Sequence, residues 1–176
     1  MNFLAHAFLA GDDAALVVGG VIGDWIKGPL PANLPGDLAR GVALHRAIDS
    51  WADTHPAFQR SRNRVSPLRR RYAGVLVDMY YDHLLAREWE RFHSVSLSVY
   101  CRGVYAAMSH RRVDLPDDSH GALARMAEQD WLGSYITVQG IADVLQRMSC
   151  RARRPNPLAG GEEDYLADAA GYEAVA

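Results

Sequence analysis

The stretch VDMYYDHLL, Val77 to Leu85, is apolar at most positions, yet it carries Asp78, Asp82 and His83 in its middle. Residues three, four and seven apart share one face of an α-helix. This spacing places Asp78 and Asp82 on a core-facing apolar stripe and turns His83 toward its flank. Two buried carboxylates one turn apart are costly unless their charge is relieved. An arginine, a shared proton or a metal ion could relieve it.

The composition predicts a folded globular chain. It has 176 residues, of which 49% are hydrophobic, and this suits one domain with a sizeable core. The net charge of -2 argues against bulk nucleic-acid binding, so no nucleic-acid partner is expected. All but one of the 19 basic residues are Arg, the type suited to forked recognition of phosphate and carboxylate. Genomic GC bias would produce the same skew.

Three features predict a cytoplasmic protein that neither enters nor binds a membrane. Cys101 and Cys150 form no CxxC motif and no zinc-like spacing, which is typical of a reduced compartment. The first 13 residues, MNFLAHAFLAGDD, lack the basic region of a signal peptide. The longest apolar run, 14–23, is too short to span a bilayer.

The hydrophobic pattern predicts an all-α fold, a single-domain helical bundle over residues 1–155. The remaining residues, 156–176, are expected to form a polar C-terminal tail with at most one short helix. The expected helices span residues 2–10, 12–25, 37–55, 66–92, 94–110, 120–132 and 134–150. Ser66 is expected to cap the fourth helix, with Pro67 at its first position, and residues 60–66 to form a basic connector.

Three other expected helices also place ionisable groups on apolar faces. His45 and Asp49 lie four residues apart on the third helix, Asp24 lies on the second, and His6 lies among apolar residues of the first. Nitrogen and carboxylate ligands from facing helices commonly build metal sites inside helical bundles. A mixed His and Asp set suits manganese, iron, magnesium or zinc. The absence of candidate Cys ligands weakens the case for structural zinc.

These residues also have explanations that need no metal. His6 could be a hydrogen-bonded core histidine, and Asp24 could simply end its helix. Two aspartates have an arginine nearby on the same helix as an alternative partner: Asp78 with Arg71, and Asp49 with Arg46. The recurrence on four separate helices is what favours a metal centre. The other histidines are expected to be structural or surface residues: His55, His93, His110 and His120.

Several segments together resemble the acyl carrier protein phosphodiesterase family in order and spacing. They are MNFLAHAFLA (1–10), GGVIGDWIKG (19–28), GVALHRAID (41–49), VDMYYDHLL (77–85) with Trp89, and QDWLGSYITVQGIADVLQRMSCRARRP (129–155). The resemblance implies an all-helical fold similar to the HD-domain phosphohydrolases. It also implies hydrolysis of holo acyl carrier protein, which releases 4′-phosphopantetheine and leaves the apo protein. A divalent cation is implied, chiefly Mn²⁺, with Mg²⁺ or Fe²⁺ as alternatives.

Carried over residue by residue, the resemblance also implies a site. The implied metal ligands are Asp24, His45, Asp78 and Asp82, and the implied catalytic residues are His6, Asp49, Asp82 and His83. The adjacent residues Asp82 and His83 point about 100° apart on a helix. One of them can bind the ion while the other orients a ligand through a hydrogen bond. The chain departs from the family at LAGGEEDYLADAAGYEAVA (158–176), which is shorter and richer in Ala than the expected final helix.

The resemblance implies a partner, acyl carrier protein, whose recognition helix is acidic. A cluster of arginines is therefore its expected docking surface. Its members are Arg60, Arg62, Arg64, Arg69 and Arg70. Two other functions stay open. One is an HD-like metal phosphohydrolase acting on a nucleotide or small phosphoester. The other is a non-enzymatic helical module that binds an acidic partner.

Overall fold

Residues 3–175 are described by the computed structural model, and they contain helices and no strand, which confirms the predicted all-α fold. The α-helices are α1 (Phe3–Leu9), α2 (Ala14–Ile22), α3 (Gly36–Thr54), α4 (Pro56–Arg64), α5 (Ala73–Arg87), α6 (Leu97–His110), α7 (Asp117–Glu128), α8 (Trp131–Ser134), α9 (Val138–Arg151), α10 (Glu162–Ala167) and α11 (Ala169–Glu173). Four 3₁₀ helices join them: η1 (Gly23–Trp25), η2 (Arg70–Tyr72), η3 (Trp89–Arg91) and η4 (Arg112–Asp114). The expected start of the first helix at Asn2 lies outside the described residues.

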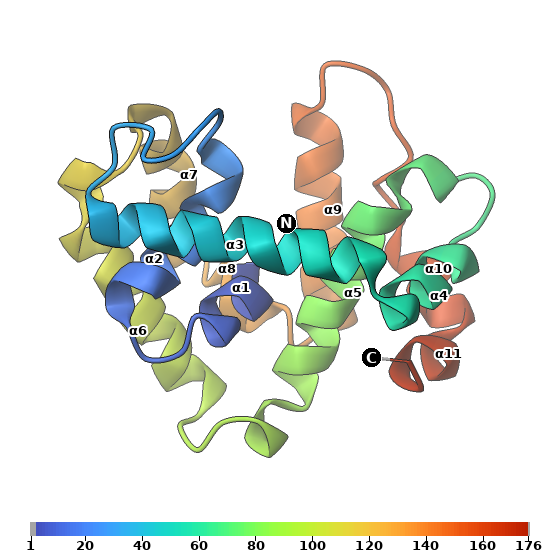
Figure 1. Ribbon diagram of the computed structural model, residues 1–176. Helices are drawn as coiled ribbons and strands as arrows, with labels where there is room; N and C mark the ends of the chain where they lie inside the picture. The colour runs from blue at the N-terminus through green and yellow to red at the C-terminus, as the bar shows by residue number, and fades with distance from the viewer. Residues whose placement is uncertain (1–2, 176) are drawn as a thin grey trace.

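Helix α3 lies across the middle of the molecule, with α6 and α7 toward one end and α4, α10 and α11 toward the other (Figure 1). Helices α2 and α3 approach each other closely where two glycines meet. A Cβ atom added to Gly19 would lie 2.6 Å from the Cα of Gly41. Glycine at both positions therefore brings these two backbones together. Within residues 3–175, no helix is both long enough and apolar enough to cross a membrane.

Local sequence signals explain where the first helices begin and end. The Asp13 side chain accepts hydrogen bonds from the backbone N–H groups of Ala15 and Leu16, at 2.9 and 3.2 Å, and so caps α2. Helix α3 ends at Thr54 because Pro56 disfavours helical geometry in the residue before it. Pro56 then occupies the first turn of α4, where its missing N–H costs nothing.

The region that follows α3 differs from the prediction. Residues 56–64 form helix α4, so the expected basic connector is a helix instead. Helix α5 begins at Ala73, after the short helix η2, and not at Ser66 and Pro67. The backbone N–H of Ser66 donates to the Asp164 carboxylate at 2.8 Å. This long-range bond holds Ser66 in the loop, an interaction that the local sequence does not show.

The C-terminal segment also differs from the expected polar tail. It forms two helices, α10 and α11, which bury Tyr165 and Tyr172 against Tyr80 of α5. The Tyr80 ring centroid lies 5.4 Å from that of Tyr165 and 4.9 Å from that of Tyr172. Aromatic contacts at such distances stabilise a core beyond the area they bury. The segment is therefore part of the folded domain.

Arg69 fastens this segment to the rest of the chain. Its guanidinium donates to Asp164 at 3.0 Å, to Glu163 at 3.1 Å and to the Pro157 carbonyl at 2.9 Å. The side chains of Arg69 and Asp164 are only 10% and 8% exposed. An ion pair that is this buried leaves a costly unpaired charge when one partner is removed.

We expect Arg69→Ala to lower the free energy of unfolding by about 3 kcal/mol, because Asp164 would keep its buried charge without a cation. Arg70→Ala is the matched control, since Arg70 is the next residue and is exposed. Its expected effect is within about 0.5 kcal/mol. Urea unfolding followed by circular dichroism measures both, and equal effects of the two variants would contradict the assigned role of Arg69.

Candidate functional site

Three of the predicted site residues form one compact cluster. The rings of His6 and His45 stack with their centroids 3.9 Å apart and their planes 25° from parallel. One Asp49 carboxylate oxygen lies 3.1 Å from His6 Nε2, and the other lies 3.2 Å from His45 Nε2. One potential ligand atom from each residue lies within 4.8 Å of the others. The cluster joins α1 to α3, two helices far apart in the sequence.

A backbone carbonyl fixes the orientation of the His45 ring. His45 Nδ1 lies 2.8 Å from the Gly20 carbonyl oxygen, which can only accept, so Nδ1 carries a hydrogen and donates it. His45 Nε2 then faces Asp49 at 3.2 Å and Asp24 at 3.8 Å. A nitrogen lone pair facing two carboxylates is unfavourable unless a cation lies between them. This geometry therefore calls for either a proton or a metal ion on Nε2.

The charges of the cluster support each other. Burial works against protonation of His45, but the Asp49 and Asp24 carboxylates raise its pKa above the ordinary value of 6.5. Burial likewise works against ionisation of Asp49, yet hydrogen bonds from His45 and His6 hold its pKa well below the usual range. Asp49 thus stays ionised. Because His45 holds its proton more firmly than an exposed histidine, protons compete with any metal ion for this ring.

The donor set fits a divalent transition metal. Two imidazole nitrogens and a carboxylate are ligands that manganese, iron and zinc accept. Among the described residues, no hydrogen-bond partner satisfies the buried atoms His6 Nδ1 and Asp24 Oδ2. The Asp49 side chain is 46% exposed, so the cluster is reachable from solvent. Unsatisfied buried donor and acceptor atoms beside an open carboxylate are consistent with a site that binds an ion.

Asp78 lies near this cluster on α5. Burial raises the pKa of its carboxyl, the negative charge of Asp49 raises it further, and His6 lowers it. Asp24 lies 3.8 Å from His45 Nε2, and the roles of Asp24 and Asp78 as metal ligands stay predictions. Arg46, an alternative partner for Asp49, instead donates to the Ile26 carbonyl at 3.0 Å.

Asp82 is fully buried one turn further along α5 and binds the start of α1. Its two carboxylate oxygens accept hydrogen bonds from the backbone N–H groups of Leu4 at 3.1 Å and Ala5 at 2.8 Å. Burial raises the pKa of the Asp82 carboxyl to about 7, although these two hydrogen bonds lower it. Both oxygens are thus engaged with the helix that carries His6. This position suits a residue that holds α1 in place.

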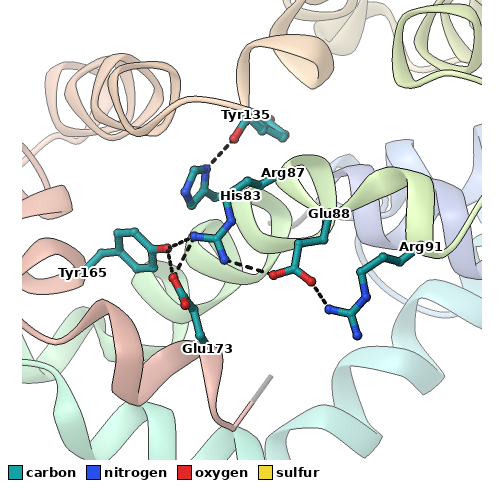
Figure 2. A network of polar contacts seen from close by, with 7 residues as sticks. All are labelled: His83, Arg87, Glu88, Arg91, Tyr135, Tyr165 and Glu173. Atoms are coloured by element: carbon teal, nitrogen blue, oxygen red, sulfur yellow. Dashed lines mark hydrogen bonds and ion pairs between the residues drawn. The ribbon is translucent and has the colours of Figure 1, made fainter.

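His83, the next residue of α5, contacts other parts of the chain. Its Nδ1 donates to the Tyr135 carbonyl at 2.7 Å, and its ring meets Tyr165 edge-on at 5.1 Å. Figure 2 shows it beside the ion-pair network that joins Arg87 to Glu173 at 2.7 Å. Burial lowers the pKa of His83, so the ring is held neutral. The structure therefore does not bring His83 together with His6, His45 and Asp49.

The predicted docking arginines divide into two groups. Arg69 points inward and binds the C-terminal segment, as described above. Arg62 pairs with Asp53 at 3.4 Å and Arg64 pairs with Asp168, both at the surface. Arg60 and Arg70 are exposed. Arg62 and Arg70 line one polar hollow of about 350 Å³ between α4 and the start of α5.

Two glycines support the cluster, and residue-type arguments alone do not reveal them. Gly20 supplies the carbonyl that orients His45. Gly23 has no side chain where the His45 ring lies: an added Cβ would sit 2.3 Å from the ring carbon Cγ. Both glycines lie in the GGVIGDWIKG segment that carries the family resemblance, but their contacts with His45 join residues more than twenty positions apart.

An all-helical domain with a cluster of two buried histidines and a solvent-accessible aspartate defines the class of protein, a helical protein with a candidate metal centre. The family model described as acyl carrier protein phosphodiesterase matches residues 1–175. The chain therefore belongs to the acyl carrier protein phosphodiesterase family, and the resemblance described from the sequence is confirmed.

Individual relatives agree with this membership. The chain is 29% identical over 176 residues to an acyl carrier protein phosphodiesterase of Photorhabdus laumondii, covering 99% of this chain and 89% of the relative. It is 28% identical to that of Pectobacterium atrosepticum, covering 93% and 86%, and 29% identical to that of Yersinia pestis, covering 91% and 83%. No solved structure matches the chain.

We expect Gly23→Ala to displace the His45 ring and weaken Mn²⁺ binding at least about tenfold, because the new methyl group would overlap the ring. Gly74→Ala on α5 is the matched control, since nothing lies within 4 Å of its added Cβ. It should leave Mn²⁺ binding unchanged. Mn²⁺ titration followed by electron paramagnetic resonance measures both, and unchanged binding in Gly23→Ala would contradict the site.

Proposed function

We propose that this chain hydrolyses the phosphodiester between 4′-phosphopantetheine and a serine of holo acyl carrier protein. The products are apo acyl carrier protein and free 4′-phosphopantetheine. Family membership supports the substrate, because the relatives carry this activity in their names. The observation that carries the chemistry is the His6, His45 and Asp49 cluster, whose ligand atoms lie within 4.8 Å of one another.

We propose that this cluster holds one or more divalent ions, with Mn²⁺ as the expected metal and Mg²⁺ or Fe²⁺ as alternatives. His6, His45 and Asp49 would provide the core of the site, and Asp24 and Asp78 would complete it. A bound divalent ion lowers the pKa of a water molecule and offsets negative charge on a phosphoryl group, which is the chemistry that a phosphodiester needs.

The residues of the chain have distinct parts in this proposal. The Gly20 carbonyl keeps the hydrogen of His45 on Nδ1 and so presents Nε2 to the ion. Asp49 orients both histidine rings with one carboxylate and stays ionised near neutral pH. A carboxylate with so low a pKa is a poor proton acceptor, so Asp49 suits ligation and orientation better than general-base catalysis.

Two predicted catalytic residues take supporting parts. Asp82 would set the position of His6 by holding the first turn of α1 through Leu4 and Ala5. His83 would stabilise the contact between α5, Tyr135 and the C-terminal helices. Neither assignment requires contact with the substrate. Both explain why ionisable groups lie in the apolar middle of VDMYYDHLL.

The proposal also includes docking of the carrier protein on the basic surface of α4. Arg60 on α4 and Arg70 at the start of η2 are exposed, and Arg62 and Arg64 are partly exposed and paired with Asp53 and Asp168. Arg69 is buried beneath the C-terminal segment. Exposed arginines attract an acidic partner over several ångströms and increase its association rate.

We expect Asp49→Asn to lower kcat/KM for holo acyl carrier protein at least about 100-fold, because the neutral amide cannot balance a cation held by two histidines. Asp53→Asn is the matched control: it lies one turn further along α3, is exposed and pairs with Arg62. It should keep nearly full activity. Mass spectrometry of the carrier protein, with Mn²⁺ added, detects the loss of the phosphopantetheine mass.

Two results would contradict the proposed function. One is an Asp49→Asn variant that retains full turnover while folded, as judged by circular dichroism. The other is a wild-type protein that leaves holo acyl carrier protein intact but hydrolyses members of a nucleotide panel. The second result would favour a small-molecule phosphohydrolase on the same metal site.

Docking on α4 predicts a KM that rises with salt, because screening weakens the attraction between opposite charges. We expect Arg60→Glu to raise KM several-fold at low salt with little effect on kcat. Arg102→Glu on α6 is the control, since Arg102 is exposed and outside the basic surface of α4. Initial rates at 25 and 250 mM salt test this, and a salt-independent KM would contradict it.

A further inference from the structure

An apolar groove of about 790 Å³ lies beside the candidate metal centre. Helix α3 forms one wall through Leu44, Ala47, Ile48 and Trp51. The opposite lining comes from α1, from the start of α4, from α5 and from Val175 beyond α11; it includes Ala5, Leu9, Phe58 and Tyr81. Its volume and lining are those of a site for a small molecule or flexible chain.

The groove and the cluster are neighbours on the same two helices. On α3, Leu44 and Ile48 directly precede His45 and Asp49. On α1, Ala5 directly precedes His6. Successive helical residues point about 100° apart, so each helix presents the cluster on one face and the groove on the adjoining face. A substrate group at the cluster can therefore extend directly into the groove.

The groove exposes large apolar side chains. Trp51 is 64% exposed and Leu9 is 54% exposed. Contiguous exposed apolar surface of this kind commonly marks a binding site. Two smaller cavities, of about 260 and 310 Å³, contain no residue adjacent in sequence to His6, His45 or Asp49. The 790 Å³ groove, in contrast, is lined by a sequence neighbour of each of the three cluster residues.

We propose that this groove binds the pantetheine arm of the carrier protein, with any acyl chain on its thiol lying toward Phe58 and Tyr81. This inference rests on the proposed function. The lining residues run from Leu44 on α3 to His55 directly after its end, a span of roughly 16 Å at the helical rise per residue. An extended chain of about a dozen bonds, such as the arm between its phosphate and its sulfur, reaches roughly 15 Å.

Tyr81 offers a polar group among the apolar walls of the groove. The Tyr81 hydroxyl lies 2.9 Å from Ser61 Oγ, and burial raises its pKa while nearby Arg60 lowers it. Methyl and methylene groups of the arm would lie against Trp51, Leu44 and Ile48. Its amide groups would face either this hydroxyl pair or the open side of the groove. A neutral, partly apolar chain matches these walls better than a charged ligand does.

Direct binding tests the proposal without hydrolysis. Pantetheine and S-decanoyl-pantetheine are titrated into the full chain, with Trp51 fluorescence as the readout and Trp51→Phe as the blank. We expect the decanoyl compound to bind at least about tenfold more tightly, because its chain buries additional apolar surface. Ala47→Trp, which fills the groove from an exposed position on α3, should abolish this gain. Ala106→Trp at an exposed position on α6 should not.

The outcomes separate this inference from the proposed function. Binding in the groove without cleavage of holo acyl carrier protein would overturn the function and keep the groove assignment. Cleavage by the wild type with equal binding of both compounds, unaffected by Ala47→Trp, would overturn the groove assignment alone. If Ala47→Trp weakened binding of apo acyl carrier protein, which has no arm, the groove would contact the protein surface and the proposal would be wrong.

Discussion

The Asp49 carboxylate is the interaction on which the candidate site depends. Its two oxygens reach His6 on α1 and His45 on α3, and so tie α1 to α3 through residues 43 positions apart, His6 and Asp49. The same contacts favour a negative Asp49 and a positive His45. The histidines lower the pKa of Asp49, while Asp49 and Asp24 raise the pKa of His45. An ion at this position would replace a proton without rearranging the helices.

Close helix packing makes that interaction geometrically attainable. Gly19 and Gly41 allow α2 and α3 to approach, and Gly20 and Gly23 leave room for the His45 ring and orient it. Asp82 of α5 holds the first turn of α1 through the N–H groups of Leu4 and Ala5. The candidate metal site therefore depends on backbone contacts as much as on its possible ligands, which is usual for sites whose supporting groups orient the ligands.

Helical periodicity was enough to predict the all-α fold and to place His45, Asp49 and Asp24 on core-facing positions. It could not show that His6 and His45 stack, or that Asp82 binds the N–H groups of α1, because these contacts join segments far apart in the chain. Arg69 and Ser66 were misjudged for the same reason, since their partners Asp164 and Glu163 lie nearly a hundred residues away. Tyr165 and Tyr172 lie on two separate short helices, α10 and α11, and their packing against Tyr80 of α5 is again a contact between distant segments.

The central claim is that His6 and His45 both bind the ion. Electron spin-echo envelope modulation of the Mn²⁺-loaded protein measures this directly, because nitrogen nuclei bound to manganese modulate the echo. The account predicts modulation from two histidine nitrogens, reduced to one in each of the variants His6→Ala and His45→Ala. An Mn²⁺ signal with no histidine nitrogen coupling in the wild type would contradict it.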